Sequence, residues 1–152
     1  MTATQSKEFF VSYSTASRAI HQYSRVRTHG GVESANPHQL TRMLLDGALS
    51  CIAGARGHME RGEIAAKGES ISRSLDIIEG LRGSLDIARG GELAGRLESL
   101  YEYMARRLLE ANAGNDLGAL DEVAGLLRPI KEAWDAIPVE LRKLPREAIP
   151  AA

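Results

Sequence analysis

The chain has 152 residues, of which 43% are apolar, 26% are charged and only 5% are aromatic, and its formal net charge is -1 at pH 7. This length is that of one domain whose core needs neither a metal ion nor a disulfide. A charge so close to zero gives no broad positive field, which argues against a dedicated nucleic-acid-binding protein. The single cysteine, Cys51, excludes an intrachain disulfide, and no run approaches the roughly 18 apolar residues of a membrane span. The composition therefore favours a soluble, all-α protein of a reducing compartment.

The first part of the chain differs from the rest. Residues 1–19 are rich in Ser and Thr and show no sustained helical stripe, which predicts a flexible N-terminal extension. Ile20, Tyr23 and Val26 then follow at spacings of three, which favours one short amphipathic segment of helix. Two glycines separate this segment from the first long periodic stretch.

Two long helices are predicted next, over residues 37–61 and 63–84. Asn36 is a good N-cap, and Pro37 suits the first helical position because its missing N–H would have no partner there. Apolar residues at helical spacing indicate the buried face of each helix. They are Leu40, Leu44, Ala48, Cys51, Ala55 and Met59 in the first helix, and Ile64, Ile71, Leu75 and Ile78 in the second.

Two further helices are predicted over residues 92–112 and 117–137, after a break at Gly90 and Gly91. Their inward stripes are Leu93, Leu97, Leu100, Met104, Leu108 and Ala111, and then Leu120, Val123, Leu127, Ile130, Trp134 and Ile137. Pro129 falls inside the last stripe and is expected to kink that helix. Pro138 ends the periodicity, so residues 138–152 are expected to form a flexible tail.

Four amphipathic helices joined by short loops predict an antiparallel up-down-up-down four-helix bundle, preceded by a small N-terminal helical segment. The bundle domain covers residues 20–137. The chain contains no Glu-x-x-His pair for a di-iron centre, no second cysteine for haem attachment, and no nucleophile beside a base. No catalytic residue, metal ligand or cofactor is therefore expected, and the chain is not expected to be an enzyme.

One histidine suggests an alternative function. Histidine phosphotransfer domains are also four-helix bundles, and His58 lies beside Arg56, Gly57 and Arg61. A cation in the last turn of a helix is, however, already favoured by the helix dipole, and this simpler explanation is preferred. The phosphotransfer module stays an alternative, together with a homodimeric structural bundle.

The first three long helices carry more apolar residues than one buried stripe requires. The surplus residues are Leu45, Leu49, Ile52, Ile77, Leu81 and Tyr101. Burying a leucine contributes about 1.5–3 kcal/mol, so an exposed surplus would forgo stability and favour aggregation. Something is expected to cover it: the neighbouring helices, the segment around residues 20–26, a dimer mate, or a client helix in a groove.

Several stretches together carry a resemblance to a known family. They are IHQYSRV near the start, ANPHQLTRMLLDGAL in the first long helix, LRGSLDIARGGELAGRLESLYEYMARRLLEAN in the next two, and DEVAGLLRPIKEAWDAI in the last. Over roughly residues 20–137 the chain resembles the FliS family of flagellar export chaperones. It departs from the family pattern in its longer N-terminus and in Pro129.

The resemblance implies a cytoplasmic chaperone on a four-helix bundle that holds the disordered C-terminal segment of flagellin. Holding this segment would prevent premature polymerisation and keep flagellin competent for type III export. It also implies docking at the export gate protein FlhA, and a homodimer is a further expectation for the client-free chain. Ile20, Tyr23 and Val26 match the family's N-terminal apolar positions, which implies that they control access to the binding surface. The candidates for an apolar client groove are Leu45, Leu49, Ile52, Ile77, Leu81, Tyr101 and Tyr103.

Overall fold

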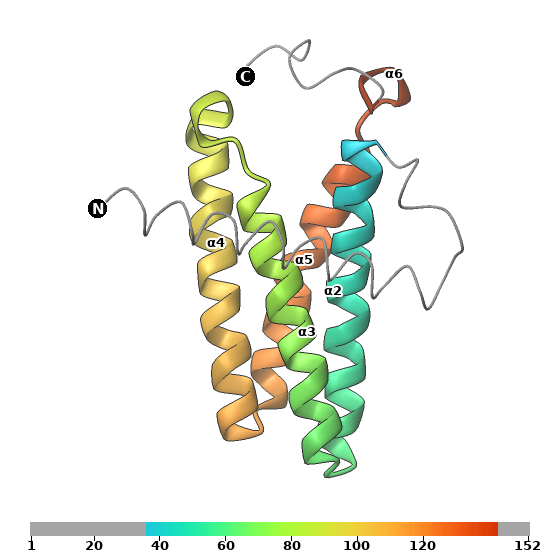
Figure 1. Ribbon diagram of the computed structural model, residues 1–152, viewed down its shortest axis with the longest axis vertical. Helices are drawn as coiled ribbons and strands as arrows, with labels where there is room; N and C mark the ends of the chain where they lie inside the picture. The colour runs from blue at the N-terminus through green and yellow to red at the C-terminus, as the bar shows by residue number, and fades with distance from the viewer. Residues whose placement is uncertain (1–35, 143–152) are drawn as a thin grey trace, which may run out of the picture.

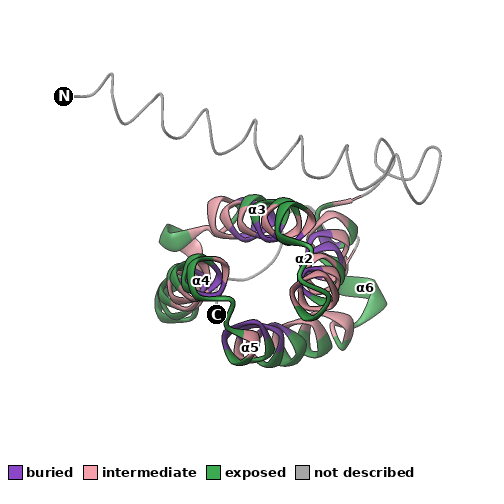
Figure 2. Ribbon diagram, turned by 90° about the horizontal axis from the view of Figure 1, so that it is seen from below, coloured by how far each residue is buried: buried purple, intermediate pink, exposed green. Residues whose placement is uncertain are grey.

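The structure, a computed structural model, describes residues 36–142 as an antiparallel helical bundle (Figure 1). Its elements are α2 (Pro37–Glu60), α3 (Ile64–Gly83), α4 (Ile87–Gly114), α5 (Leu117–Asp135) and the single turn α6 (Val139–Arg142). Along the bundle, α2 packs against α3 and α5, and α4 packs against the same two helices (Figure 2). The predicted all-α, up-down-up-down bundle is confirmed. The expected N-terminal helical segment lies outside the described residues.

Local hydrogen bonds explain where α2 and α5 begin. Asn36 accepts a hydrogen bond from the backbone N–H of Gln39 at 2.9 Å, and the Gln39 side chain accepts one from the backbone N–H of Asn36 at 3.1 Å. This capping box satisfies two donors that the first turn would otherwise leave unpaired. Asp116 caps α5 with a single hydrogen bond, which its side chain accepts from the backbone N–H of Ala119 at 3.2 Å. Both starts lie where the sequence placed them.

The start of α4 is the largest departure from the predicted boundaries. A short helical turn begins at Ile87 rather than at residue 92, and Asp86 caps it by accepting from the N–H of Arg89 at 3.1 Å. Gly91 then leaves helical geometry, with φ 54° and ψ -132°, before the long part of the helix continues. The predicted break at the glycine pair is thus present, but one extra turn of helix precedes it.

The C-terminal part continues beyond the last long helix. α5 runs as one element from Leu117 to Asp135 and contains Pro129, and the kink expected at this residue stays a prediction. The turn α6 follows within the predicted tail, and Arg142 donates hydrogen bonds to the backbone carbonyls of Ile137 at 2.7 Å and Asp135 at 2.5 Å. These bonds satisfy carbonyls that the end of α5 leaves free. Residues 143–152 lie outside the described residues.

The core runs along the bundle axis and is built almost entirely from aliphatic side chains. Its largest members are Leu45, Ile52, Ile71, Ile78, Leu81, Met104, Leu108, Leu120, Val123 and Leu127, none more than 2% exposed. Two residues assigned to inward stripes are not part of it: Ile64 is 71% exposed and Leu93 is 64% exposed. Each lies in the first turn after a glycine break at one end of the bundle, where fewer helices surround it (Figure 1).

Cys51 packs against this core from α2 and is half-buried. Burial raises the pKa of its thiol, while the positive charge of Arg73 acts in the opposite direction. A higher pKa lowers the thiolate fraction at neutral pH, and the thiolate is the reactive form. Cys51 is thus a packing residue of the kind its helical spacing predicted.

Two aromatic side chains tie the start of α2 to the end of α5. The indole N–H of Trp134 donates to the backbone carbonyl of His38 at 3.0 Å, and His38 Nε2 lies 3.0 Å from the carbonyl of Trp134. The two rings stack with their centroids 5.2 Å apart and their planes 11° from parallel. Because the carbonyl only accepts, His38 must carry its proton on Nε2. This reciprocal pair closes one end of the bundle.

Trp134→Phe is expected to lower the free energy of unfolding by about 0.5–1.5 kcal/mol, since it removes one hydrogen bond and retains a ring that stacks. Urea unfolding followed by circular dichroism measures the change, because the variant has no tryptophan left to report fluorescence. An unchanged urea midpoint would mean that the indole N–H contributes nothing to closing the bundle.

Candidate partner-binding surface

Five of the seven candidate groove residues lie inside the bundle. Leu45 and Ile52 of α2, Ile77 and Leu81 of α3, and Tyr101 of α4 are all at most 4% exposed. Within residues 36–142, the neighbouring helices of the bundle cover these five side chains. Each helix packs against two others, so it needs a wider apolar face than a single stripe provides. These residues therefore present no surface to a partner in this structure, and the expectation of an open groove lined by them is corrected.

Burial also affects the chemistry of Tyr101, the largest of the five. Loss of solvent around its phenol raises the pKa of Tyr101 to about 12. The hydroxyl thus stays protonated over the whole physiological range. Tyr101 is a neutral core side chain and not a titrating group.

The other two candidates, Leu49 and Tyr103, are half-buried. The Tyr103 hydroxyl donates to the carboxylate of Glu122 on α5, and this hydrogen bond is the main reason that the pKa of Glu122 is lowered. Arg107 donates to the other oxygen of the same carboxylate at 2.9 Å. The guanidinium of Arg106 lies 5.8 Å from the centre of the Tyr103 ring. Tyr103 thus joins α4 to α5 through its hydroxyl, and contact of Leu49 or Tyr103 with a partner stays a prediction.

The three residues assigned to the N-terminal gate, Ile20, Tyr23 and Val26, lie outside the described residues. Their role stays a prediction.

Among residues 36–142, the large apolar side chains that face solvent are a different set. They are Ile64 on α3, Ile87, Leu93 and Leu109 on α4, and Val139 and Leu141 on α6, each between 43% and 71% exposed. Sequence reasoning assigned Ile64 and Leu93 to inward stripes and gave no role to Ile87 and Leu109. It placed Val139 and Leu141 in the expected tail. One signal was available for Leu109: it directly follows Leu108, and two neighbouring positions on a helix cannot both face the same core. The adjacent helices α3 and α4 thus carry four of these exposed apolar side chains.

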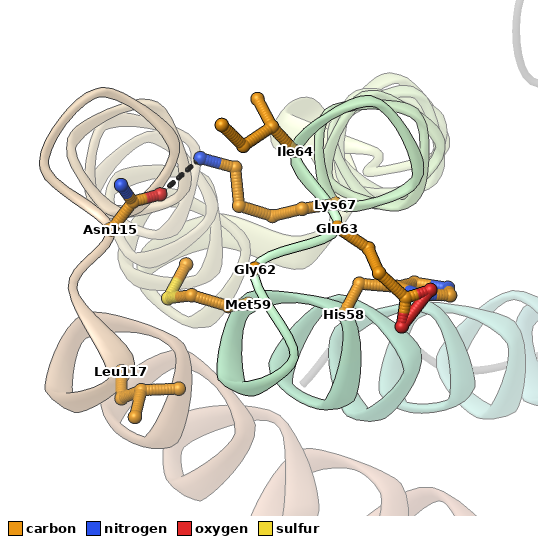
Figure 3. Close-up of a pocket in the computed structure, with 8 residues that line it drawn as sticks. All are labelled: His58, Met59, Gly62, Glu63, Ile64, Lys67, Asn115 and Leu117. Carbon is orange, nitrogen blue, oxygen red and sulfur yellow. Dashed lines mark hydrogen bonds and ion pairs between the residues drawn. The ribbon is translucent and has the colours of Figure 1, made fainter.

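A pocket of about 230 Å³ lies at the end of the bundle where α2 turns into α3 and α4 turns into α5 (Figure 3). It is lined by His58, Met59, Gly62, Glu63, Ile64, Lys67, Asn115 and Leu117. Lys67 is only 4% exposed, and its ammonium donates to the backbone carbonyl of Asn112 at 3.0 Å and to the side-chain oxygen of Asn115. It thereby caps the C-terminal end of α4, where a positive charge is favoured.

Sequence reasoning passed over Lys67, although a signal was present. Lys67 lies four residues before Ile71 and therefore on the inward stripe of α3. A lysine at such a position requires hydrogen-bond partners within the fold, because a buried charge without them is costly.

On the other side of the same turn, His58 belongs to a small charged cluster. Its Nδ1 lies 3.2 Å from a guanidinium nitrogen of Arg61 and 3.4 Å from a carboxylate oxygen of Glu63. Arg61 also donates to Glu63, and this bond is the main cause of the lowered pKa of that carboxyl. His58 lies in the last turn of α2, as predicted. These contacts involve only the Nδ1 atom of the imidazole, and the phosphotransfer module stays an alternative hypothesis.

Within residues 36–142, no group of three or more His, Cys, Asp or Glu side chains could hold a metal ion. None of the helices described there is long and apolar enough to cross a membrane.

Comparison with known proteins identifies the family. Residues 19–140 match the family described as flagellar protein FliS. The chain is 51% identical over 122 residues to the flagellar secretion chaperone FliSB of Pseudomonas aeruginosa, a match that covers 80% of this chain and 97% of the relative. It is 50% identical over 119 residues to the flagellar secretion chaperone FliS of Salmonella typhimurium, covering 78% of this chain and 88% of the relative. A match to the FliS of Escherichia coli, at 42% identity over 120 residues, covers the same shares. The chain belongs to the FliS family of flagellar proteins.

Proposed function

We propose that this protein is a secretion chaperone that binds the disordered C-terminal segment of flagellin, keeps it from polymerising early and holds it competent for flagellar type III export. The observation that carries the proposal is 51% identity to a flagellar secretion chaperone over 97% of that relative's length. Because the client has to be held before it leaves the cell, the chaperone acts in the cytoplasm. Delivery would involve docking at the export gate protein FlhA.

The outer face of the bundle supports this proposal physically. Leu109 on α4 is 57% exposed and Ile64 on α3 is 71% exposed, on helices that pack side by side. A disordered segment that folds on such a surface gains affinity from apolar burial spread over a wide area, and this gain is offset by the cost of ordering the segment. Leu49 and Tyr103 are further contact candidates on the same bundle, and Ile20, Tyr23 and Val26 would control access to it.

A peptide with the sequence of the flagellin C-terminal segment is expected to bind this protein with a strongly negative heat-capacity change. Burial of 1,000–3,000 Å² in coupled folding and binding corresponds to on the order of -0.2 to -0.5 kcal/mol/K. Isothermal titration calorimetry at several temperatures measures this slope.

A scrambled peptide of the same composition is the matched control, because it keeps the charge and loses the apolar pattern. Absence of binding, or binding whose enthalpy does not change with temperature, would contradict the proposal. Sedimentation of the chain alone shows whether a second copy covers the same surface when no client is present.

A further inference from the structure

Lys67 is a buried cation whose described partners are all neutral. Among residues 36–142 its ammonium is bonded to a backbone carbonyl and to an amide oxygen, and no carboxylate lies within ion-pair distance. An ammonium has three N–H donors, so one donor has no acceptor among these residues. Buried lysines are ordinarily paired with a negative group, and the end of α4 supplies only a partial negative charge. The pocket next to Lys67 thus has room and an unused donor for an anion.

The one carboxylate in the pocket wall is engaged elsewhere. Glu63 is hydrogen-bonded to Arg61 and contacts His58, and Figure 3 shows its side chain directed toward His58 while Lys67 extends toward Asn115. Besides Asn115, the pocket wall near Lys67 includes the apolar side chains of Met59, Ile64 and Leu117. A positive charge set among aliphatic side chains complements a ligand that carries a carboxylate beside an aliphatic group.

We propose that this pocket binds a carboxylate of a partner peptide, with a neighbouring aliphatic side chain of the peptide placed against Ile64 and Leu117. The carboxylate would accept a charge-assisted hydrogen bond from Lys67 Nζ, which is stronger than the bonds that Lys67 makes to neutral oxygens. A volume of about 230 Å³ lies below the 300–1,000 Å³ typical of small-molecule sites, so it suits one or two residues of a longer chain. The inference rests on the proposed function only in taking the peptide to be the flagellin segment.

N-acetyl-leucine and N-acetyl-leucinamide test the pocket directly, because they share one shape and differ in charge. We expect N-acetyl-leucine to shift the methyl NMR signals of Ile64 and Leu117 and to bind about tenfold more tightly than the amide. Lys67→Met is expected to abolish this difference. Equal affinities for the two compounds, or shifts confined to other residues, would overturn the proposal.

A second pair of variants keeps Lys67 and its bonds to α4 intact. Ile64 is 71% exposed, so Ile64→Glu and Ile64→Gln are both expected to leave the fold unchanged. The glutamate places a negative charge beside the pocket and is expected to weaken N-acetyl-leucine binding at least fivefold relative to the glutamine. Leu93→Glu, at the opposite end of the bundle and 64% exposed, makes the same charge change and is expected to leave binding unaffected. Equal binding by the two Ile64 variants would overturn the proposal.

A second probe distinguishes a side-chain carboxylate of the peptide from a C-terminal one. N-acetyl-leucyl-glutamate amide carries its carboxylate on a side chain, whereas N-acetyl-leucine carries it at the chain end. The compound that binds more tightly shows which kind of carboxylate the pocket prefers. Failure of the pocket is distinguishable from failure of the proposed function. If the flagellin peptide binds and neither acid does, only the pocket is rejected; if an acid binds and the flagellin peptide does not, only the client is rejected.

Discussion

Leu108→Ala is expected to lower the free energy of unfolding by about 2–5 kcal/mol, whereas Leu109→Ala changes it by less than about 0.5 kcal/mol. The two leucines are neighbours on α4 and have the same helix propensity, yet Leu108 is fully buried and Leu109 is 57% exposed. Truncating Leu108 removes apolar contacts and leaves a cavity between four helices, while truncating Leu109 removes surface that water already reaches. The pair therefore separates core packing from every effect of the local backbone.

Urea unfolding of both variants, followed by Trp134 fluorescence, measures the two changes, and equal m-values would confirm that the same surface is exposed in each. The roles are expected to reverse in client binding. Leu109→Ala should lower the affinity for the flagellin peptide, because it removes an exposed apolar side chain that the client can contact. Leu108→Ala should leave its affinity nearly unchanged under conditions where the variant is folded. Equal loss of stability in the two variants would show that Leu108 is not in the core.

The fold could be predicted because its determinants are local. Asn36 with Pro37 at the start of α2, and Asp116 at the start of α5, are signals that act within one turn of helix, and both helices begin at the predicted residues 37 and 117. The periodicity of apolar residues identified the four helices for the same reason. Pro129 lies within α5, which continues as one helix across it, and the kink expected there stays a prediction.

The surface was harder to predict, because exposure depends on which helices lie next to each other. Ile64 and Leu93 have the spacing of core residues, and only their position at the ends of the bundle exposes them. Conversely, Ile77 and Leu81 appear surplus on one helix and are buried because α3 has two neighbours. The periodicity of apolar residues identifies the buried face of a single helix, whereas a surface groove depends on how several helices pack together.

The pocket shows the same limit. Lys67, Asn115 and Met59 come from three different helix ends, and no spacing along the chain relates them. The lysine on an inward stripe was the one local sign, and its meaning depends on the end of α4 that it contacts. Sites assembled between helices are therefore read from the structure, even when the helices themselves are read from the sequence.

Gly91→Ala is expected to lower the free energy of unfolding by about 1–3 kcal/mol, because it places a side chain in a backbone region that essentially only glycine occupies. The observed φ of 54° with ψ of -132° turns the chain between Gly90 and the long part of α4. Gly90 does not offer an alternative site for a side chain, since a Cβ there would lie 2.6 Å from that of Ala94. Both glycines are thus required by the same turn.

Gly125→Ala is the matched control, and its expected effect has the opposite sign. Gly125 lies within α5, is exposed, and has nothing within 4 Å of the position that a Cβ would take. Alanine there should stabilise the helix by about 0.5–1 kcal/mol. Thermal unfolding distinguishes the two variants, because the melting temperature shifts by about 2–4 °C for each kcal/mol in a chain of this size. A higher melting temperature for Gly91→Ala would mean that residue 91 is helical in solution. In that case α4 would continue unbroken through Ile87, and Leu93 would face a different direction from the one described.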